Sequence, residues 1–95
     1  MAIHLHKNDL PDGLSLGPVV AIDTETMGLN PRRDRLCLVQ LSSGDGNAHL
    51  VQIAKGQKSA PNLERLLTDP AVIKLFHFGR FDIAAMKQAF GVTTA

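Results

Sequence analysis

Two carboxylates that directly follow an apolar run are the residues best placed to do chemistry. Asp23 and Glu25 come after Val19–Ile22, a run whose β-branched residues are typical of a buried strand. Side chains at i and i+2 of a strand share one face, so both carboxylates should project on the same side. Like charges held together are usually stabilised by a cation, and hard ions such as Mg²⁺ or Mn²⁺ prefer oxygen ligands. The pattern indicates a metal site, and two solvated acids at a strand end are the competing interpretation.

A third carboxylate, Asp82, follows another apolar segment, residues 72–78, and falls in the first turn of a helix predicted at 80–90. An acid at this position stabilises the helix dipole by about 0.3–1 kcal/mol without any further role. If the strand before it lies parallel to the strand that ends at Asp23 and Glu25, the three acids come together. Three acids without neighbouring lysines favour metal binding over salt bridges.

The elements that must position these acids follow from hydrophobic periodicity and from the turn residues between periodic segments. In chain order we predict strands at 3–6, 19–26, 36–42 and 48–53, a helix at 61–68, a strand at 72–78 and a helix at 80–90. This order predicts one small α/β domain. The second to fourth strands should form an antiparallel meander, and the strand after the first helix should lie parallel beside the second strand.

The composition narrows the possible functions. The 95 residues contain 10 Lys and Arg against 9 Asp and Glu, a formal charge of +1, so any polyanion must be bound locally or through metal. No apolar stretch approaches the roughly 20 residues of a membrane-spanning helix, and the N-terminus lacks the pattern of a signal peptide. The single Cys37 cannot form an intrachain disulfide, which predicts a reducing, cytoplasmic location.

Three sequence motifs follow one another along the chain: Ile22-Asp23-Thr24-Glu25-Thr26-Met27-Gly28-Leu29, Asp34-Arg35-Leu36-Cys37-Leu38-Val39-Gln40-Leu41 and His77-x-x-x-Phe81-Asp82. In this order they closely resemble the ribonuclease D-like branch of the DEDD 3′–5′ exonucleases. The resemblance implies a ribonuclease H-like mixed sheet with flanking helices. It also implies two divalent cations, Mg²⁺ or Mn²⁺, which activate water against the terminal phosphodiester of RNA, or of single-stranded DNA, at its 3′ end.

The resemblance also assigns roles to single residues. Asp23 would bridge both ions, Glu25 would hold the ion that carries the nucleophilic water, and Asp82 would support the second ion. Substrate binding falls on five other positions, which are Thr26, Met27, Leu29, His77 and Phe81. Among these, His77 stands where the family commonly has Asn, and Phe81 fills an aromatic position that is expected to pack under the metal site.

The family's third motif, a tyrosine four residues before an aspartate, has no counterpart in this chain. The sequence contains no tyrosine, and no aspartate follows Asp82. We therefore interpret residues 1–95 as a truncated, N-terminal part of a 3′–5′ exonuclease domain that is weakly active alone. Two alternatives stay open: a catalytically inactive fragment that binds nucleic acid or a partner, and a ribonuclease H-like endonuclease. Exposed strand edges also make self-association an expectation.

A cluster of arginines and a pair of histidines give weaker indications of function. Arg32, Arg33 and Arg35 cluster after the first motif, where they form either a solvated turn or a set of phosphate contacts. His4 and His6 alternate with apolar residues on a predicted edge strand. We expect solvated histidines there, with a surface metal pair as the alternative.

Overall fold

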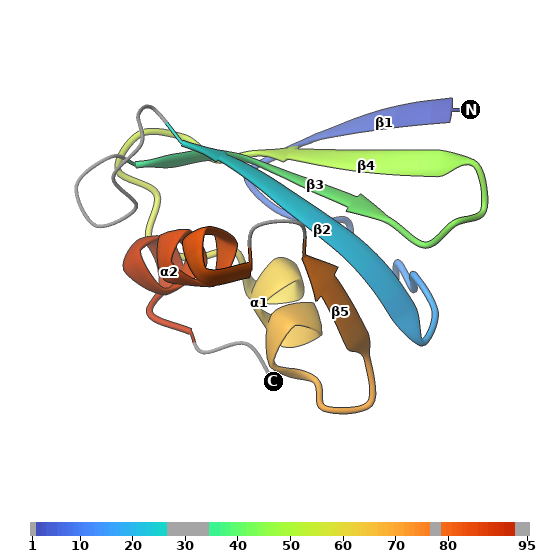
Figure 1. Cartoon of the computed structure of the whole chain (residues 1–95). Helices are drawn as coiled ribbons and strands as arrows, with labels where there is room; N and C mark the ends of the chain where they lie inside the picture. The colour runs from blue at the N-terminus through green and yellow to red at the C-terminus, as the bar shows by residue number, and fades with distance from the viewer. Residues whose placement is uncertain (1, 27–34, 77–78, 93–95) are drawn as a thin grey trace.

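A mixed sheet with two helices on one side makes up the fold (Figure 1). The computed structural model describes residues 2–26, 35–76 and 79–92. Within these ranges the elements are β1 (Ala2–Lys7), β2 (Val19–Thr26), β3 (Leu36–Ser42), β4 (Asn47–Gln52), α1 (Pro61–Thr68), β5 (Ile73–Phe76) and α2 (Gly79–Phe90). The predicted order of strands and helices is confirmed, with boundaries that move by one or two residues.

The strand order in the sheet is β1-β4-β3-β2-β5. Strands β2, β3 and β4 form the predicted antiparallel meander, and β5 pairs parallel to β2 after the crossover through α1. The α/β mixed sheet is therefore confirmed. Strand β1 lies at the opposite edge, where it pairs parallel to β4, a partnership that the sequence pattern did not predict.

A tight turn sets the register between β3 and β4. Gly44 and Gly46 both have positive φ angles, of 81° and 87°, which glycine adopts without steric cost. Between them, the Asp45 carboxylate accepts a hydrogen bond from the Asn47 N–H at 2.9 Å. The turn thus leads the chain directly from β3 into β4, its antiparallel partner.

The connector after β1 fixes the start of α1. The carboxylate of Asp9 accepts hydrogen bonds from the backbone N–H groups of Asn62 and Leu63, both at 2.9 Å. These are first-turn groups that have no partner within a helix, and the negative charge also favours the positive end of the helix dipole. The connector is therefore attached to the helix that covers the sheet.

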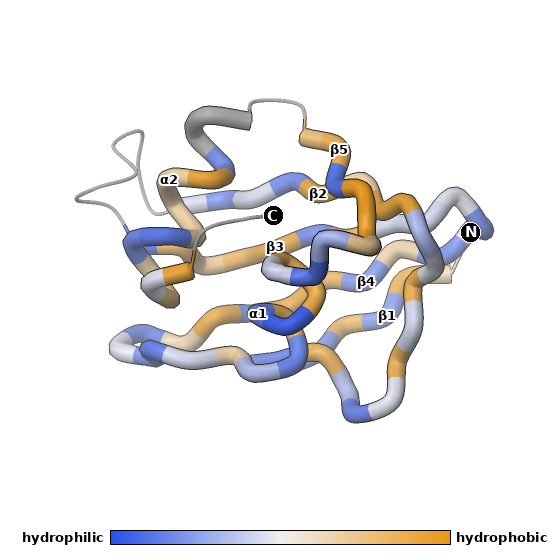
Figure 2. Tube along the Cα trace, turned by 90° about the horizontal axis from the view of Figure 1, so that it is seen from below, coloured by the Kyte–Doolittle hydropathy of each residue, from blue (hydrophilic) through white to orange (hydrophobic). Residues whose placement is uncertain are grey.

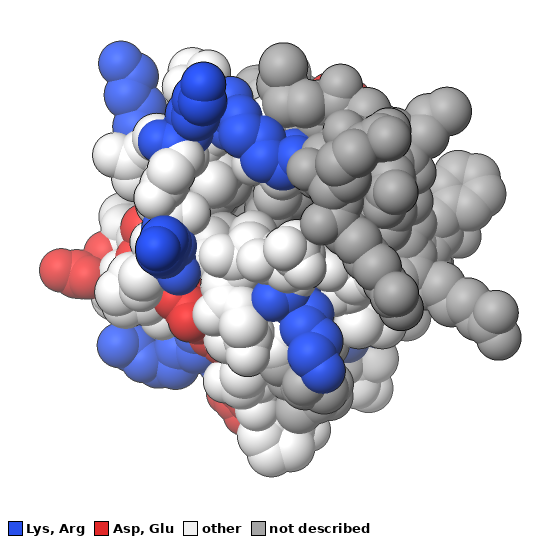
Figure 3. Space-filling model, turned by 90° about the vertical axis from the view of Figure 1, so that its left-hand side faces the viewer, with Lys and Arg blue, Asp and Glu red and all other residues white. Residues whose placement is uncertain are grey.

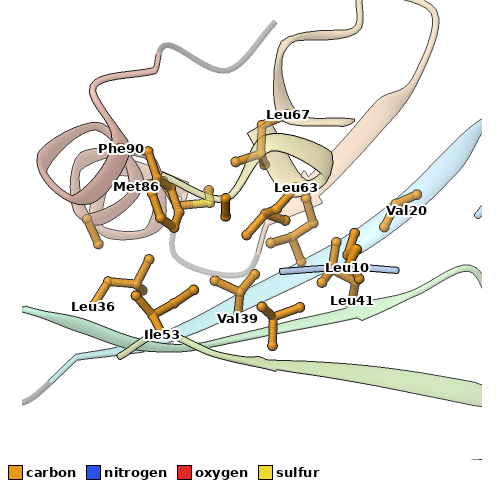
Figure 4. Close-up of a cluster of buried hydrophobic side chains, with 14 of the residues drawn as sticks. Leu10, Val20, Leu36, Val39, Leu41, Ile53, Leu63, Leu67, Met86 and Phe90 are labelled. Atoms are coloured by element: carbon orange, nitrogen blue, oxygen red, sulfur yellow. The ribbon is translucent and has the colours of Figure 1, made fainter. Parts of the chain in front are cut away.

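Both helices pack on the same face of the sheet, which we call the inner face (Figures 1 and 2). Side chains from α1 and α2 meet strand residues there in a continuous apolar core (Figure 4). Its fully buried members include Val20, Val39, Leu41, Val51, Leu63, Leu67 and Met86. The other side of the sheet, the outer face, is not covered by any helix of the described residues (Figure 1). No helix in the described part of the chain is long and apolar enough to cross a membrane.

Candidate active site

Strand β2 presents Asp23 and Glu25 on the outer face of the sheet. The side chains of Val20, Ile22 and Thr24 are buried on the inner face, whereas the two acids between and after them are exposed. This alternation follows from the two-residue period of a strand. The predicted common face of the two carboxylates is therefore present in the fold.

Asp82 lies on the other side of β2. Its side chain is 1% exposed and accepts a hydrogen bond from the Thr24 hydroxyl, in the first turn of α2. The topology brings the start of α2 to β2 as predicted, but the strand separates this carboxylate from the two outer acids. Among the residues that the structure describes, no three His, Cys, Asp or Glu side chains are placed to share a metal ion. The convergence of all three acids stays a prediction.

The two outer acids supply oxygen donors of the type that a hard divalent cation prefers. Asp23 accepts a hydrogen bond from the Thr24 N–H at 3.0 Å, and no Lys or Arg of the described ranges forms an ion pair with Asp23 or Glu25. Neighbouring carboxylates that lack a basic partner favour a bound cation, and carboxylate oxygens are the ligands that Mg²⁺ and Mn²⁺ prefer. The residues present therefore fit part of a divalent metal site.

A hollow of about 560 Å³ lies beside Glu25, at the end of the sheet where β1, β2 and β4 finish. Lys7, Arg35 and Gln52 contribute to its lining. The Arg35 guanidinium donates a hydrogen bond to the carbonyl of Ile53 at 2.8 Å. This bond holds the positive charge of Arg35 at the rim of the hollow. Figure 3 faces this end of the molecule and shows Lys and Arg side chains spread over it, with fewer Asp and Glu. An anionic ligand that reaches Glu25 would therefore meet positive charge on its way.

Of the five predicted substrate residues, the described part of the chain includes Thr26 and the backbone of Phe81. Thr26 is the last residue of β2 and is half-buried, just after a shift in the β2–β3 register. Phe81 belongs to α2, but its side chain lies outside the described part. Met27, Leu29, Arg32, Arg33 and His77 also lie outside the described residues.

A histidine cluster on the inner face was missed by the sequence analysis. His49 on β4 is 8% exposed, and its ring stacks on those of His4 and His6, with centroids 4.9 and 5.3 Å apart. The rings of His6 and His49 also form a 3.0 Å hydrogen bond. The residues meet because β1 pairs with β4, so no signal within one segment could have revealed the cluster. His4 is exposed and His6 is half-buried on the edge strand, as expected, and their contacts with the buried His49 also hold this strand to the sheet.

The cluster predicts a pH dependence of stability. Burial and the neighbouring His4 and His6 lower the pKa of His49 below its ordinary value of 6.5, and Asp45 opposes this only weakly. A histidine with a lowered folded-state pKa gains its proton first in the unfolded chain, so the free energy of unfolding should fall as the pH drops below 6.5. Urea unfolding of the wild type and of His49→Gln between pH 5 and 8 measures this. An equally steep loss in both proteins would contradict the assignment.

The sequence of the chain matches a known protein family. The family model described as 3′–5′ exonuclease matches residues 7–95, and the chain belongs to this family. The resemblance to ribonuclease D-like exonucleases is confirmed by curated relatives named Ribonuclease D. The one from Granulibacter bethesdensis is 43% identical over 74 residues, which cover 78% of this chain and 18% of the relative.

Solved structures agree with this placement. The structure of Brucella melitensis NrnC with bound Mg²⁺ matches all of this chain with a TM-score of 0.93 and 57% identity, over 48% of the NrnC chain. Escherichia coli RNase D matches 81% of this chain with a TM-score of 0.66 and 28% identity, over 20% of its own length. The chain thus spans about half the length of NrnC and about a fifth of the ribonuclease D relatives.

Proposed function

We propose that this chain is the N-terminal part, residues 1–95, of a metal-dependent 3′–5′ exoribonuclease of the ribonuclease D type. The observation that carries the proposal is the pair Asp23 and Glu25, which stand exposed on one face of β2, with Glu25 at a hollow that Lys7 and Arg35 also line, in a chain of the exonuclease family. One structure of the similar protein NrnC contains Mg²⁺ and another contains pGG. The proposed substrate is accordingly the 3′ end of RNA.

The proposed metal ligands are Asp23 and Glu25, which would hold two divalent cations, Mg²⁺ or Mn²⁺. Such ions neutralise phosphate charge and supply an activated water when bound. Asp82 is also proposed as a third acid of the metal site, because the first turn of α2, which carries it, lies against the segment of β2 that carries Asp23 and Glu25. Through the Thr24 hydroxyl it also fixes the segment of β2 on which those two stand.

A ladder assay tests the reaction. An RNA oligonucleotide labelled at its 5′ end is incubated with the chain and Mn²⁺, and the products are separated by length. The exonuclease predicts slow, stepwise shortening from the 3′ end. Internal fragments would instead indicate the ribonuclease H-like endonuclease, and binding without cleavage would indicate an inactive binding fragment. A DNA strand of the same sequence, run in parallel, reports the preference between RNA and single-stranded DNA.

The basic side chains at the hollow, Lys7 and Arg35, are proposed to contact substrate phosphates. Arg35→Ala should weaken binding of a short RNA several-fold and reduce the slope of log K against log salt by about 0.7, the value for one lost contact to a single strand. Fluorescence anisotropy at several salt concentrations measures both quantities. The matched control is Arg65→Ala, because Arg65 lies on α1 and hydrogen-bonds Asn62, away from the hollow. Equal slopes for the wild type and Arg35→Ala would contradict a phosphate contact.

Self-association belongs to the same proposal as a property of the chain on its own. Strand β1 is an edge strand, and an exposed edge can pair with a second copy. Light scattering over a range of concentrations measures it directly.

A further inference from the structure

Gln40 is the polar side chain that the sheet places directly beside Asp23. In the pairing of β2 with β3, Asp23 lies opposite Gln40, and both side chains are exposed. Gln40 belongs to the outer face, because its neighbours Val39 and Leu41 are buried in the core on the inner face. Directly opposite residues have Cβ atoms about 4.5–5.5 Å apart. The amide of Gln40 is therefore within reach of the Asp23 carboxylate.

The other neighbours of Gln40 on this face compete little for its amide. Opposite it on β4 is Leu50, whose side chain has no polar atom. The next outer-face residue toward the turn, Ser42, already donates its hydroxyl to a backbone carbonyl at 3.2 Å. Glu25 is only diagonal to Gln40, at about 7–8 Å by the usual spacing of a sheet. Of the acids that the structure describes, Asp23 is the one that lies opposite the amide.

The space beside Asp23 lets the Gln40 side chain turn toward it. Both residues line one hollow of about 170 Å³, together with Ala21, Ile22 and Ser42. Neither of them lines the larger hollow at the end of the sheet. Within the described ranges the Gln40 amide is not held by a hydrogen bond to another residue. Because no other group of these ranges fixes it, the amide can rotate within the smaller hollow.

The Asp23 carboxylate needs a second donor if it is to have one fixed orientation. It accepts one hydrogen bond, from the N–H of the next residue, Thr24, at 3.0 Å. The last torsion of an aspartate side chain is broad, and its carboxylate offers about four lone-pair positions. Carboxylates that bind metal are in turn hydrogen-bonded by neighbouring groups, which orient them. A donor on the adjacent strand is placed to do this.

We propose that Gln40 is a positioning residue of the metal site, whose amide N–H donates a hydrogen bond to the Asp23 carboxylate and orients it toward the cation. This inference rests on the proposed function, because it takes Asp23 as a metal ligand. Hydrogen bonds within active sites often tighten only when the ligand binds, so the exposure of Gln40 is compatible with this role.

Two other roles fit Gln40 less well. Its amide oxygen is a possible ligand for a hard cation, but the amide N–H groups would then turn toward Leu50, which offers no side-chain acceptor. A purely structural glutamine would be expected to bond within the sheet, whereas Gln40 is exposed. Donation to Asp23 uses the amide hydrogens and leaves the carboxylate oxygens to the cation.

Mn²⁺ titration of Gln40→Met tests the proposal. Met keeps the length of the side chain and removes both amide hydrogens, and the position is exposed, so the chain should keep its fold, as urea unfolding will check. We expect the Mn²⁺ affinity to fall about tenfold, the lower end of what a partner of a metal ligand contributes. The matched control is Gln88→Met at an exposed position of α2, which should stay within about twofold of the wild type. An unchanged affinity in Gln40→Met, or an equal loss in the control, would overturn the proposal.

A double-mutant cycle shows whether Gln40 acts through Asp23. In the Asp23→Ala background, Gln40→Met should change the Mn²⁺ affinity by less than about twofold, because the acceptor of the hydrogen bond is gone. In the Glu25→Gln background the same change should still cost about tenfold. Equal losses in both backgrounds would mean that position 40 contacts the cation independently of Asp23, and would overturn the positioning role.

The failure of this inference is distinguishable from that of the proposed function. If Asp23→Asn does not weaken Mn²⁺ binding, Asp23 is not a ligand and both proposals are wrong. If Asp23→Asn weakens Mn²⁺ binding and Gln40→Met does not, the metal site stands and only the role of Gln40 is wrong.

Discussion

The substitution Asp23→Asn is expected to weaken Mn²⁺ binding by at least about tenfold, the lower end of what even a supporting partner of a metal ligand contributes. Asn keeps the size and one oxygen of the side chain but removes the negative charge that faces the cation. Because Asp23 is exposed, the fold should not depend on it. Calorimetric titration with Mn²⁺ measures the affinity, and the RNA ladder assay should show a matching loss of hydrolysis.

The matched control for this substitution is Asp45→Asn. It removes the same charge from an exposed acid in the turn between β3 and β4, far along the sheet from the end of β2, and Asn before glycine suits such a turn. Mn²⁺ affinity should stay within about twofold of the wild type, since surface charges at this range are screened by salt. If both variants lost affinity equally, the loss would reflect overall charge and not a site. If neither did, Asp23 would not be a ligand.

The sequence predicted most of the fold because its strongest signals are local. The apolar run before Asp23, the glycine-rich turn at 43–46 and the leucine spacing of α1 each depend on neighbours within a few residues. The parallel pairing of β5 with β2 followed from the general geometry of a crossover connection. The pairing of β1 with β4 did not, because β1 joins the far edge of the sheet through contacts between distant parts of the chain, such as His4 with His49.

The sequence predicted one part of the candidate site, because that part also depends on a local signal. The common face of Asp23 and Glu25 follows from strand alternation alone. The side of β2 that Asp82 faces depends on how α2 packs, and that is decided by contacts such as those of Met86 with the core. A helical residue in the first turn can point toward either side of a neighbouring strand, so adjacency in topology did not determine which face its carboxylate reaches.

The contact between Thr24 and Asp82 leads to the second large expected effect. Thr24→Val keeps the shape of the side chain and removes the hydroxyl that donates to the buried carboxylate. Loss of a hydrogen-bond donor to a buried carboxyl group should lower the free energy of unfolding by about 1–3 kcal/mol. Urea unfolding at pH 7 measures it. The control Thr68→Val removes a hydroxyl that bonds the Glu64 carbonyl on an exposed helix end, and should cost less than about 0.5 kcal/mol.

Mn²⁺ titration of Asp82→Asn tells whether this acid holds β2 in place through Thr24 or binds the cation itself. In the described fold its carboxylate lies behind β2 and holds the strand from the inner face, so Asp82→Asn should reduce Mn²⁺ affinity less than Asp23→Asn does. It should also reduce the cost of Thr24→Val when the two are combined, because the amide oxygen of Asn accepts a weaker hydrogen bond from the hydroxyl than a carboxylate does. A loss of affinity equal to that of Asp23→Asn, with additive effects on stability, would instead mean that the Asp82 carboxylate reaches the cation itself and that its contact with Thr24 contributes little.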